Sequence, residues 1–191
     1  MAKAAARKDL DRVLALITEQ EIVDVACELI KRTSPTGYER NVAEYVSQWF
    51  EDIGLESIRQ EITEERMNSI GILKGTGNGV NLALNGHMDV PYSGAEDDLL
   101  YMDEEQFRSP AHTTQPFVKN GFIHGVGVGN MKASLAALMV TMKALKTGGV
   151  SLKGDLIATA VCGEIGRTPV GRHQGVQYEG SGFGSRYAVT H

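Results

Sequence analysis

Apolar residues recur at helical spacing in two stretches near the start of the chain. Residues 18–32 carry an apolar face, and Thr18 with Glu21 fits a capping box at its start. Residues 38–54 carry a second face, with Gly54 as a stop signal. These patterns predict two amphipathic helices, separated by the helix-breaking sequence SPTG. The faces consist of Ile22, Val23, Ala26, Leu29 and Ile30 in the first helix, and Val42, Tyr45, Val46 and Phe50 in the second.

Short runs of β type follow at residues 55–62, 68–75 and 80–86, and KGTGNG between the last two predicts a hairpin connection. The run DLIATAV, residues 155–161, is apolar almost throughout, which is typical of a strand buried on both faces. Helices that alternate with buried strands predict an α/β fold, specifically a three-layer sandwich with a mixed β-sheet.

Three further segments are predicted in the second half. Residues 116–125 predict a short hairpin that turns at Lys119-Asn120-Gly121, and residues 130–149 predict a helix closed by two glycines. The tail, residues 166–191, is expected to be rich in loops. The final SRYAVTH predicts the start of another element, with Tyr187, Ala188 and Val189 buried.

Composition narrows the class of protein. The chain has 191 residues, 42% hydrophobic and 23% charged, which suffices for one sizeable core. The formal net charge of −5 argues against a nucleic-acid partner. Neither a secretory signal nor a run of about 18 apolar residues is found, so we expect a cytoplasmic protein with no membrane partner. Cys27 and Cys162 lie in apolar surroundings and are expected to be free, buried thiols.

His87 and Asp89 stand at the end of the apolar run VNLAL, in NGHMDVP. Residues i and i+2 of an extended segment point to the same side, so the Asp89 carboxylate could accept a hydrogen bond from one imidazole nitrogen. The other nitrogen would then be free to bind a metal ion. Alternatively, both side chains merely satisfy the amides of a loop.

Two other segments carry candidate chemistry. HGVGVGNMKAS begins with a glycine-rich turn, where glycines could bind phosphate or could let the backbone approach a site closely and present Asn130. The spacing of known nucleotide-binding loops is absent, which disfavours a nucleotide-binding domain. Glu164 follows the buried run 155–161 and is a candidate metal ligand or general base; otherwise it is a solvated loop residue.

Taken in order, GHMDVP, GVGVGNMKAS and GEIG resemble the three motifs of the M20 family of metallopeptidases and deacylases. That family includes succinyl-diaminopimelate desuccinylase, acetylornithine deacetylase and glutamate carboxypeptidase. The resemblance extends over nearly the whole chain and implies the N-terminal portion of the family's catalytic domain. It implies further that a lid and dimerisation domain and the C-terminal catalytic portion are absent from residues 1–191.

The resemblance assigns roles residue by residue. It makes His87 a metal ligand and Asp89 the carboxylate that orients it. Asn130 stands where the family has an aspartate that bridges two metal ions. Glu164 best matches the second glutamate of the family's pair, a metal ligand, which leaves Gly163 at the position of the general base. A slip of one residue would instead make Glu164 the base.

The asparagine changes the expected metal content. A bridging carboxylate offsets the repulsion between two cations about 3.5–4 Å apart, whereas an amide oxygen is neutral. We therefore expect one labile divalent ion, zinc or manganese, held by His87, Asn130 and Glu164, with Asp89 and Glu164 as the catalytic side chains.

The implied function is that of a metal-dependent hydrolase that cleaves the C–N bond of an N-acyl amino acid or small peptide bearing a carboxylate. The alternatives are an aminohydrolase that replaces an aromatic amine by hydroxyl, a non-catalytic binding or assembly member, and a nucleotide-binding domain. The expected partners are the C-terminal remainder of the same protein and further copies in a homo-oligomer. Without that remainder, residues 1–191 are expected to be inactive.

Overall fold

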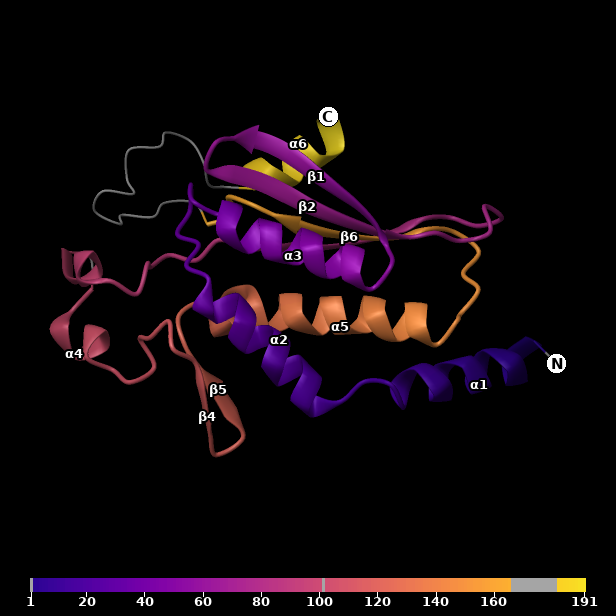
Figure 1. The fold of residues 1–191 in the computed structure, drawn as a ribbon, viewed down its shortest axis with the longest axis horizontal. Helices are drawn as coiled ribbons and strands as arrows, with labels where there is room; N and C mark the ends of the chain where they lie inside the picture. The colour runs from indigo at the N-terminus through magenta and orange to yellow at the C-terminus, as the bar shows by residue number, and fades with distance from the viewer. Residues whose placement is uncertain (1, 101, 166–181) are drawn as a thin grey trace.

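The computed structural model describes residues 2–100, 102–165 and 182–191 (Figure 1). In the described chain, a four-stranded sheet has the order β1-β2-β6-β3. Strand β6 pairs antiparallel with β2 and parallel with β3, while β1 pairs antiparallel with β2. The sheet is therefore mixed, as predicted. The strands are β1 (Glu56–Thr63), β2 (Arg66–Leu73), β3 (Leu82–His87) and β6 (Leu156–Val161).

Helices cover both faces of this sheet (Figure 1). The helices α2 (Glu19–Lys31), α3 (Arg40–Asp52) and α5 (Ala133–Thr147) lie on one side, and α6 (Phe183–Thr190) lies on the other. One half of the predicted capping box forms, since the Glu21 amide donates to Thr18 Oγ1 at 3.2 Å, while the Glu21 carboxylate pairs with Lys143. The three-layer α/β arrangement is confirmed. A further helix, α1 (Ala2–Leu14), was not predicted and packs against α5.

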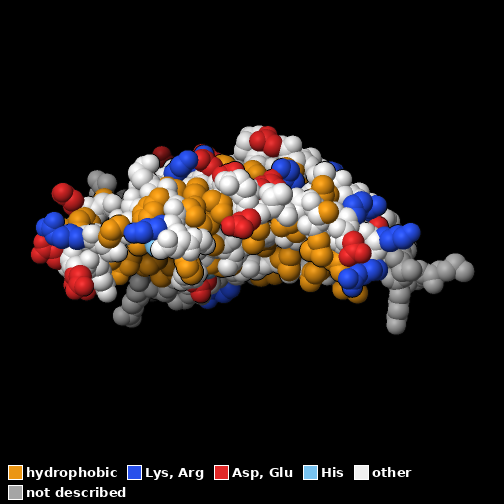
Figure 2. Space-filling model, turned by 90° about the horizontal axis from the view of Figure 1, so that it is seen from below, with side chains coloured by type: hydrophobic (Ala, Val, Ile, Leu, Met, Phe, Trp, Pro, Cys, Tyr) orange, Lys and Arg blue, Asp and Glu red, His pale blue; other side chains and the backbone are white. Residues whose placement is uncertain are grey.

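The core lies between the sheet and the large helical layer. Phe50 of α3 is fully buried, and a Cβ built on Gly71 of β2 would lie 2.7 Å from its ring. The predicted apolar faces of α2 and α3 supply much of this core, including Ala26, Leu29, Val42 and Val46. From below, hydrophobic side chains also gather along the outer face, interrupted by charges (Figure 2).

The predicted hairpin between residues 68–75 and 80–86 is wrong. Strand β6 lies between β2 and β3, so these two strands do not pair. The loop 74–79 instead packs on the segment that leads into β6: the Gly75 amide donates to Asp155 Oδ1 at 2.8 Å, and the Thr76 amide donates to Leu152 O at 2.9 Å. The most apolar strand takes the central position because it is buried on both faces.

The second predicted hairpin is confirmed. Strands β4 (Phe117–Lys119) and β5 (Phe122–His124) pair antiparallel around Asn120 and Gly121, whose φ angles of 54° and 78° match the requirements of a tight two-residue turn. Helix α5 begins at Ala133, three residues later than predicted, because η2 (Val128–Lys132) contains non-helical backbone at Asn130 and Met131. Two short elements, η1 (Glu96–Leu100) and α4 (Glu104–Phe107), precede the hairpin.

The predictions for the last residues are met in part. An element does form, as α6, but Val189 is 83% exposed, so the expected burial of that side chain is wrong. Tyr187 and Ala188 are partly buried. Of the tail expected to be rich in loops, residues 166–181 lie outside the described residues, and the remainder is mostly helix α6. Among the described residues, no helix has both the length and the apolar character needed to cross a bilayer.

Both cysteines are free thiols. Cys162 is fully buried, and burial raises the pKa of its thiol to about 12. Cys27 is only partly buried, although burial also raises its pKa. The expectation of free, buried thiols is therefore confirmed fully for Cys162, while Cys27 is free but only partly buried.

Candidate functional site

Two parallel strands bring the candidate residues together. Residue His87 at the end of β3 pairs with Val161 at the end of β6. The chain that leaves each strand therefore emerges at the same edge of the sheet, where α/β proteins typically bind ligands. Asp89 lies two residues beyond β3, and Glu164 lies three residues beyond β6. Asn130 comes from the turn before α5.

His87 is the centre of the cluster and is only 5% exposed. Its Nε2 lies 2.9 Å from Asn130 Oδ1 and 3.5 Å from Glu164 Oε2. Its Nδ1 lies 3.0 Å from the Asp89 carbonyl oxygen and 3.3 Å from Asp89 Oδ1. The structure thus brings the four predicted residues together. Burial lowers the pKa of His87, but the hydrogen bonds with Asp89 and Asn130 outweigh it and leave the pKa raised.

Asp89 also binds the backbone of the segment after β6, a contact that the sequence did not predict. Its fully buried carboxylate accepts hydrogen bonds from the amides of Glu164 and Ile165, both at 2.9 Å, and from Thr36 Oγ1 at 2.8 Å. Burial opposes the charge, but these bonds and the one with His87 outweigh it and lower the pKa of Asp89. One carboxylate therefore orients the imidazole and also fixes the loop that carries Glu164.

Sequence reasoning missed a buried ion pair behind this loop. Arg66 donates through Nε and Nη2 to the Glu39 carboxylate at 2.9 and 2.8 Å, and both side chains are 0% exposed. Burial raises the pKa of Glu39, while the bonds from Arg66 oppose the shift. Oxygen Oε1 of Glu39 also accepts from the Gly163 amide at 3.0 Å. The partners are 27 residues apart in sequence, so no local pattern signals the pair.

The loop after β6 is consequently held at four consecutive amides. The Cys162 amide donates to Asn68 Oδ1 at 3.0 Å, the Gly163 amide to Glu39, and the next two amides to Asp89. The acceptors are all buried side chains. We call residues 162–165 the anchored loop. Its amides leave little freedom to the backbone that presents Glu164.

The glycine-rich turn, residues 125–130, is built by close approach. A Cβ at Gly127, where φ is 79°, would lie 2.1 Å from Val90 Cγ1, so only glycine fits. A Cβ at Gly129 would meet nothing within 4 Å. This supports the interpretation in which glycines let the backbone approach and present Asn130, which is exposed. Just beyond, Lys132 is buried, and burial lowers the pKa of its amine to about 7.

Three side chains of the cluster could hold a divalent cation. Asn130 Oδ1 and Glu164 Oε2 both lie within 3.5 Å of His87 Nε2. Imidazole nitrogen with amide and carboxylate oxygen is an ordinary donor set for zinc or manganese. Within the described ranges, no group of three or more His, Cys, Asp and Glu side chains is placed to bind a metal. The third donor here is an amide, which carries no charge.

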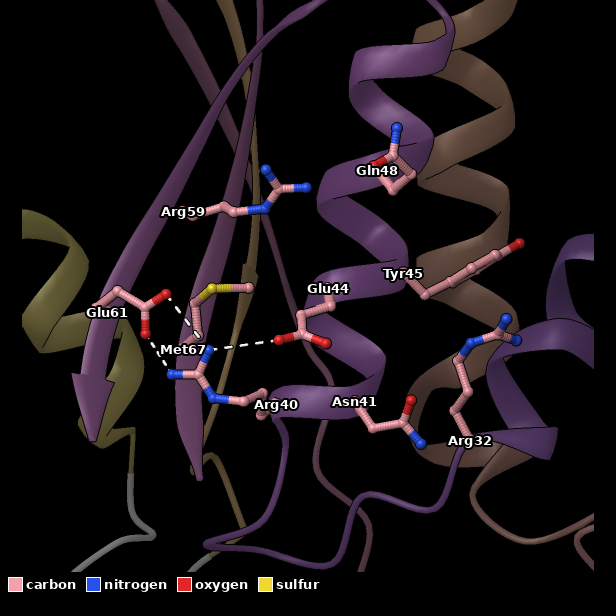
Figure 3. A pocket seen from close by; sticks show the side chains of 9 residues that line it. All are labelled: Arg32, Arg40, Asn41, Glu44, Tyr45, Gln48, Arg59, Glu61 and Met67. Atoms are coloured by element: carbon pink, nitrogen blue, oxygen red, sulfur yellow. Dashed lines mark hydrogen bonds and ion pairs between the residues drawn. The ribbon is translucent and has the colours of Figure 1, made fainter. Parts of the chain in front are cut away.

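A pocket of about 540 Å³ adjoins the cluster, and its wall includes Asn130, Gly129 and Tyr92. Another, of about 500 Å³, lies between α3 and β1 and contains none of the four site residues (Figure 3). Its charges are paired: Arg40 contacts Glu44 and Glu61 in Figure 3.

Known proteins resemble this chain in sequence and in fold. Residues 83–178 match the model of peptidase family M20/M25/M40. The chain is 30% identical over 151 residues to the N-formyl-4-amino-5-aminomethyl-2-methylpyrimidine deformylase of Bacillus subtilis, covering 76% of this chain and 33% of that protein. It is 27% identical to a probable succinyl-diaminopimelate desuccinylase of Staphylococcus aureus, covering 79% and 35%. The chain thus spans about a third of the length of these relatives.

Solved structures agree at the level of the fold. A tripeptidase from Staphylococcus aureus superposes with a TM-score of 0.60 at 22% identity, over 78% of this chain and 38% of that one. A Bacillus subtilis protein described as a dinuclear metal-binding peptidase of the M20 family gives 0.50 at 15% identity, over 76% and 35%. The arrangement of strands and helices described above is therefore one that known proteins adopt.

Proposed function

Since the chain belongs to the M20/M25/M40 peptidase family, we propose that it forms part of a metal-dependent hydrolase that cleaves an amide C–N bond. The observation that carries the proposal is the approach of Asn130 Oδ1 and Glu164 Oε2 to His87 Nε2, on a ring whose Nδ1 contacts Asp89. The relatives named as a deformylase and a desuccinylase support a small N-acyl compound as the substrate class.

In this proposal His87, Glu164 and Asn130 hold a divalent cation. When bound, such a cation polarises a substrate carbonyl and lowers the pKa of a nearby water molecule. Asp89 keeps the imidazole in one orientation through Nδ1, so that Nε2 presents its lone pair to the ion. The Asp89 carboxylate also accepts a hydrogen bond from the Glu164 amide, so one side chain positions both His87 and Glu164.

Glu164 is the candidate proton acceptor as well as a ligand. Its side chain is 52% exposed, so the carboxylate can reach a water molecule in the cleft. Gly163, which stands at the position where the family places a general base, has no side chain to do this. A carboxylate at this edge of the sheet can take one proton from water and pass it to the leaving amine.

We propose that the site holds one ion. The B. subtilis structure is described as dinuclear, but Asn130 supplies no negative charge to offset the repulsion between two cations. The neutral amide also favours a second candidate function, in which the same site removes an amino group from an aromatic ring. In either case we propose that further ligands come from the remainder of the protein, in keeping with the threefold greater length of the relatives.

The test is metal-dependent turnover by full-length protein. Metal-stripped protein, reloaded with zinc or manganese, is assayed on N-formyl and N-succinyl amines, dipeptides and aromatic amines. We expect hydrolysis of at least one amide class, abolished by chelator and by His87→Ala. A matched control is His124→Ala, which alters a histidine of the β4–β5 hairpin. Hydrolysis that survives both chelation and His87→Ala would contradict the proposal.

A further inference from the structure

The pocket beside Asn130 has an unusual lining. Its lining includes the apolar side chains of Tyr92, Met102 and Val128 and the backbone of the glycine-rich turn. Among the described residues that line it, none is Asp, Glu, Lys or Arg. A charged group would therefore lose its water there without gaining a partner of opposite charge, which is costly. The lining favours an uncharged, apolar or aromatic occupant.

His112 is the polar group of this pocket that the structure holds most firmly. Its side chain is 8% exposed, and its Nε2 lies 2.9 Å from Asp98 Oδ2. The fully buried Asp98 carboxylate also accepts from the amides of Ser93 and Gly94, at 3.0 and 2.8 Å, and from Ser93 Oγ at 3.0 Å. Asp98 thus folds the loop that follows Asp89 and orients the His112 ring at the same time.

Aromatic neighbours fix the plane of the ring. Tyr92 packs edge-on at 5.8 Å between ring centroids, and Phe107 lies tilted at 5.3 Å. Because the carboxylate oxygen accepts, Nε2 carries a proton, and in the tautomer with its single proton there Nδ1 carries a lone pair. Within the described chain, no group donates to or accepts from Nδ1 of His112. A fixed acceptor without a partner, in the wall of an uncharged pocket, is what a ligand donor group would satisfy.

We propose that this pocket binds one arm of the substrate, an uncharged aromatic or apolar group, and that His112 selects arms with a hydroxyl or amino group by accepting its hydrogen bond at Nδ1. This inference rests on the proposed function, because Asn130 belongs both to the candidate metal site and to the pocket wall. Tyr92 stands three residues after Asp89, so the scissile bond and the arm would be held by one continuous loop. A carboxylate on the substrate would lie outside this pocket.

The competing explanation is that His112 only supports the loop. Two substitutions separate the explanations. His112→Gln keeps an N–H donor for Asp98 but removes the acceptor at Nδ1, and His112→Phe keeps the packing against Tyr92 and Phe107 but removes both nitrogens. A purely structural role would be preserved better by His112→Gln, whereas a role in selection would be lost in both.

Binding is measured first, on metal-stripped full-length protein, so that it does not depend on turnover. The probes are benzamide, 3-hydroxybenzamide and 3-carboxybenzamide, titrated by ligand-observed NMR. One hydrogen bond to a protein acceptor predicts that 3-hydroxybenzamide binds about three- to tenfold tighter than benzamide. 3-Carboxybenzamide should bind more weakly than either. In His112→Gln the preference for the hydroxyl probe should vanish while the affinity for benzamide stays.

Several outcomes would overturn the inference: equal affinities for benzamide and 3-hydroxybenzamide, a preference that survives in His112→Gln, tightest binding of the carboxylate, or no binding of any probe. Turnover then gives a separate readout. On substrates with a hydroxyl-bearing arm, His112→Gln should raise KM about three- to tenfold with little change in kcat. Absence of amide hydrolysis in the wild type would contradict the proposed function, while the binding result would still decide the role of His112.

Discussion

The two walls of the candidate site are built in opposite ways. On one side the anchored loop, residues 162–165, gives all four amides to buried side chains, among them the carboxylates of Glu39 and Asp89. On the other side the glycine-rich turn, residues 125–130, is shaped by steric fit, and exposed Asn130 contacts His87. Hydrogen bonds to buried side chains, two of them carboxylates, hold the anchored loop in place. The glycine-rich turn keeps its shape because a glycine lets its backbone approach Val90 closely.

The difference shows where the protein can tolerate change. Buried carboxylates are costly to desolvate and are stable only when every acceptor site is used, so removing one partner leaves others unsatisfied. The glycine-rich turn has no such network, and its tolerance varies from one residue to the next with the available space. We therefore expect large losses from substitutions in the first wall and graded effects in the second.

The largest effect is expected at Glu39. In Glu39→Ala, Arg66 keeps its charge in a fully buried position and the Gly163 amide loses its acceptor, so the free energy of unfolding should fall by about 3–5 kcal/mol. Urea denaturation measures this loss. Thiol labelling of Cys162, which is buried in the native protein, should become faster as the anchored loop opens.

The matched control is Glu44→Ala, since Glu44 also pairs with an arginine, Arg40, but its side chain is 57% exposed. Exposed pairs contribute about 0–1 kcal/mol, so this variant should be nearly as stable as wild type. Equal losses in the two variants would show that the buried pair has no special part in holding the loop.

The next effect is expected at Asp89. Asp89→Ala removes the partner of His87 Nδ1 and the acceptor of two amides in the anchored loop. Metal affinity or activity should fall about 10–100-fold, the usual scale for a residue that orients a ligand. Calorimetric titration with zinc and with manganese measures the affinity. Unchanged affinity together with unchanged activity would disprove the coupling between Asp89 and the donor set.

Two glycines of the second wall form a matched pair. Gly127→Ala forces a Cβ to within 2.1 Å of Val90 at a φ of 79°, and should destabilise the protein by about 1–3 kcal/mol. Gly129→Ala adds a Cβ in open space and should change stability by less than about 0.5 kcal/mol. Thermal unfolding of both variants is the measurement. A tolerated Gly127→Ala would mean that close approach does not shape this turn.

The smallest of these effects is a gain. Asn130→Asp restores a charge beside His87 Nε2, and even a well-screened charge at ligand distance should tighten metal binding about tenfold. We expect no matching gain in the native reaction, because the charge of the site changes. Weaker or equal binding in titrations of Asn130→Asp would show that Asn130 does not face the ion.

Much of this arrangement could be predicted from local patterns. The helices α2, α3 and α5 follow from their apolar periodicity and caps, and β6 follows from its continuous apolar run. The pairing of β2 with β3 was predicted wrongly, because turn chemistry alone does not show that a later strand will lie between two earlier ones. Helix α1 was missed for want of a clear apolar face.

In the candidate site, too, some residues could be predicted from local sequence patterns and others could not. His87, Asp89, Asn130 and Glu164 could be singled out because each stands at a strand end or in a distinctive turn. The Glu39–Arg66 pair and the His112–Asp98 pair could not, since buried polar side chains that meet only through the fold leave no periodic trace in the sequence. Likewise, the hydrogen bonds from the anchored loop to Asp89 depend on the parallel pairing of β3 and β6.

The central claim is that the site binds a divalent ion, and that the neutral Asn130 limits it to one. Its most direct test is elemental analysis of full-length protein after mild dialysis, carried out beside His87→Ala and Asn130→Asp. The account predicts about one labile divalent ion per chain in wild type, lost in His87→Ala and retained more tightly in Asn130→Asp. Two ions per chain that survive chelator in the wild type, or an unchanged metal content in His87→Ala, would contradict it.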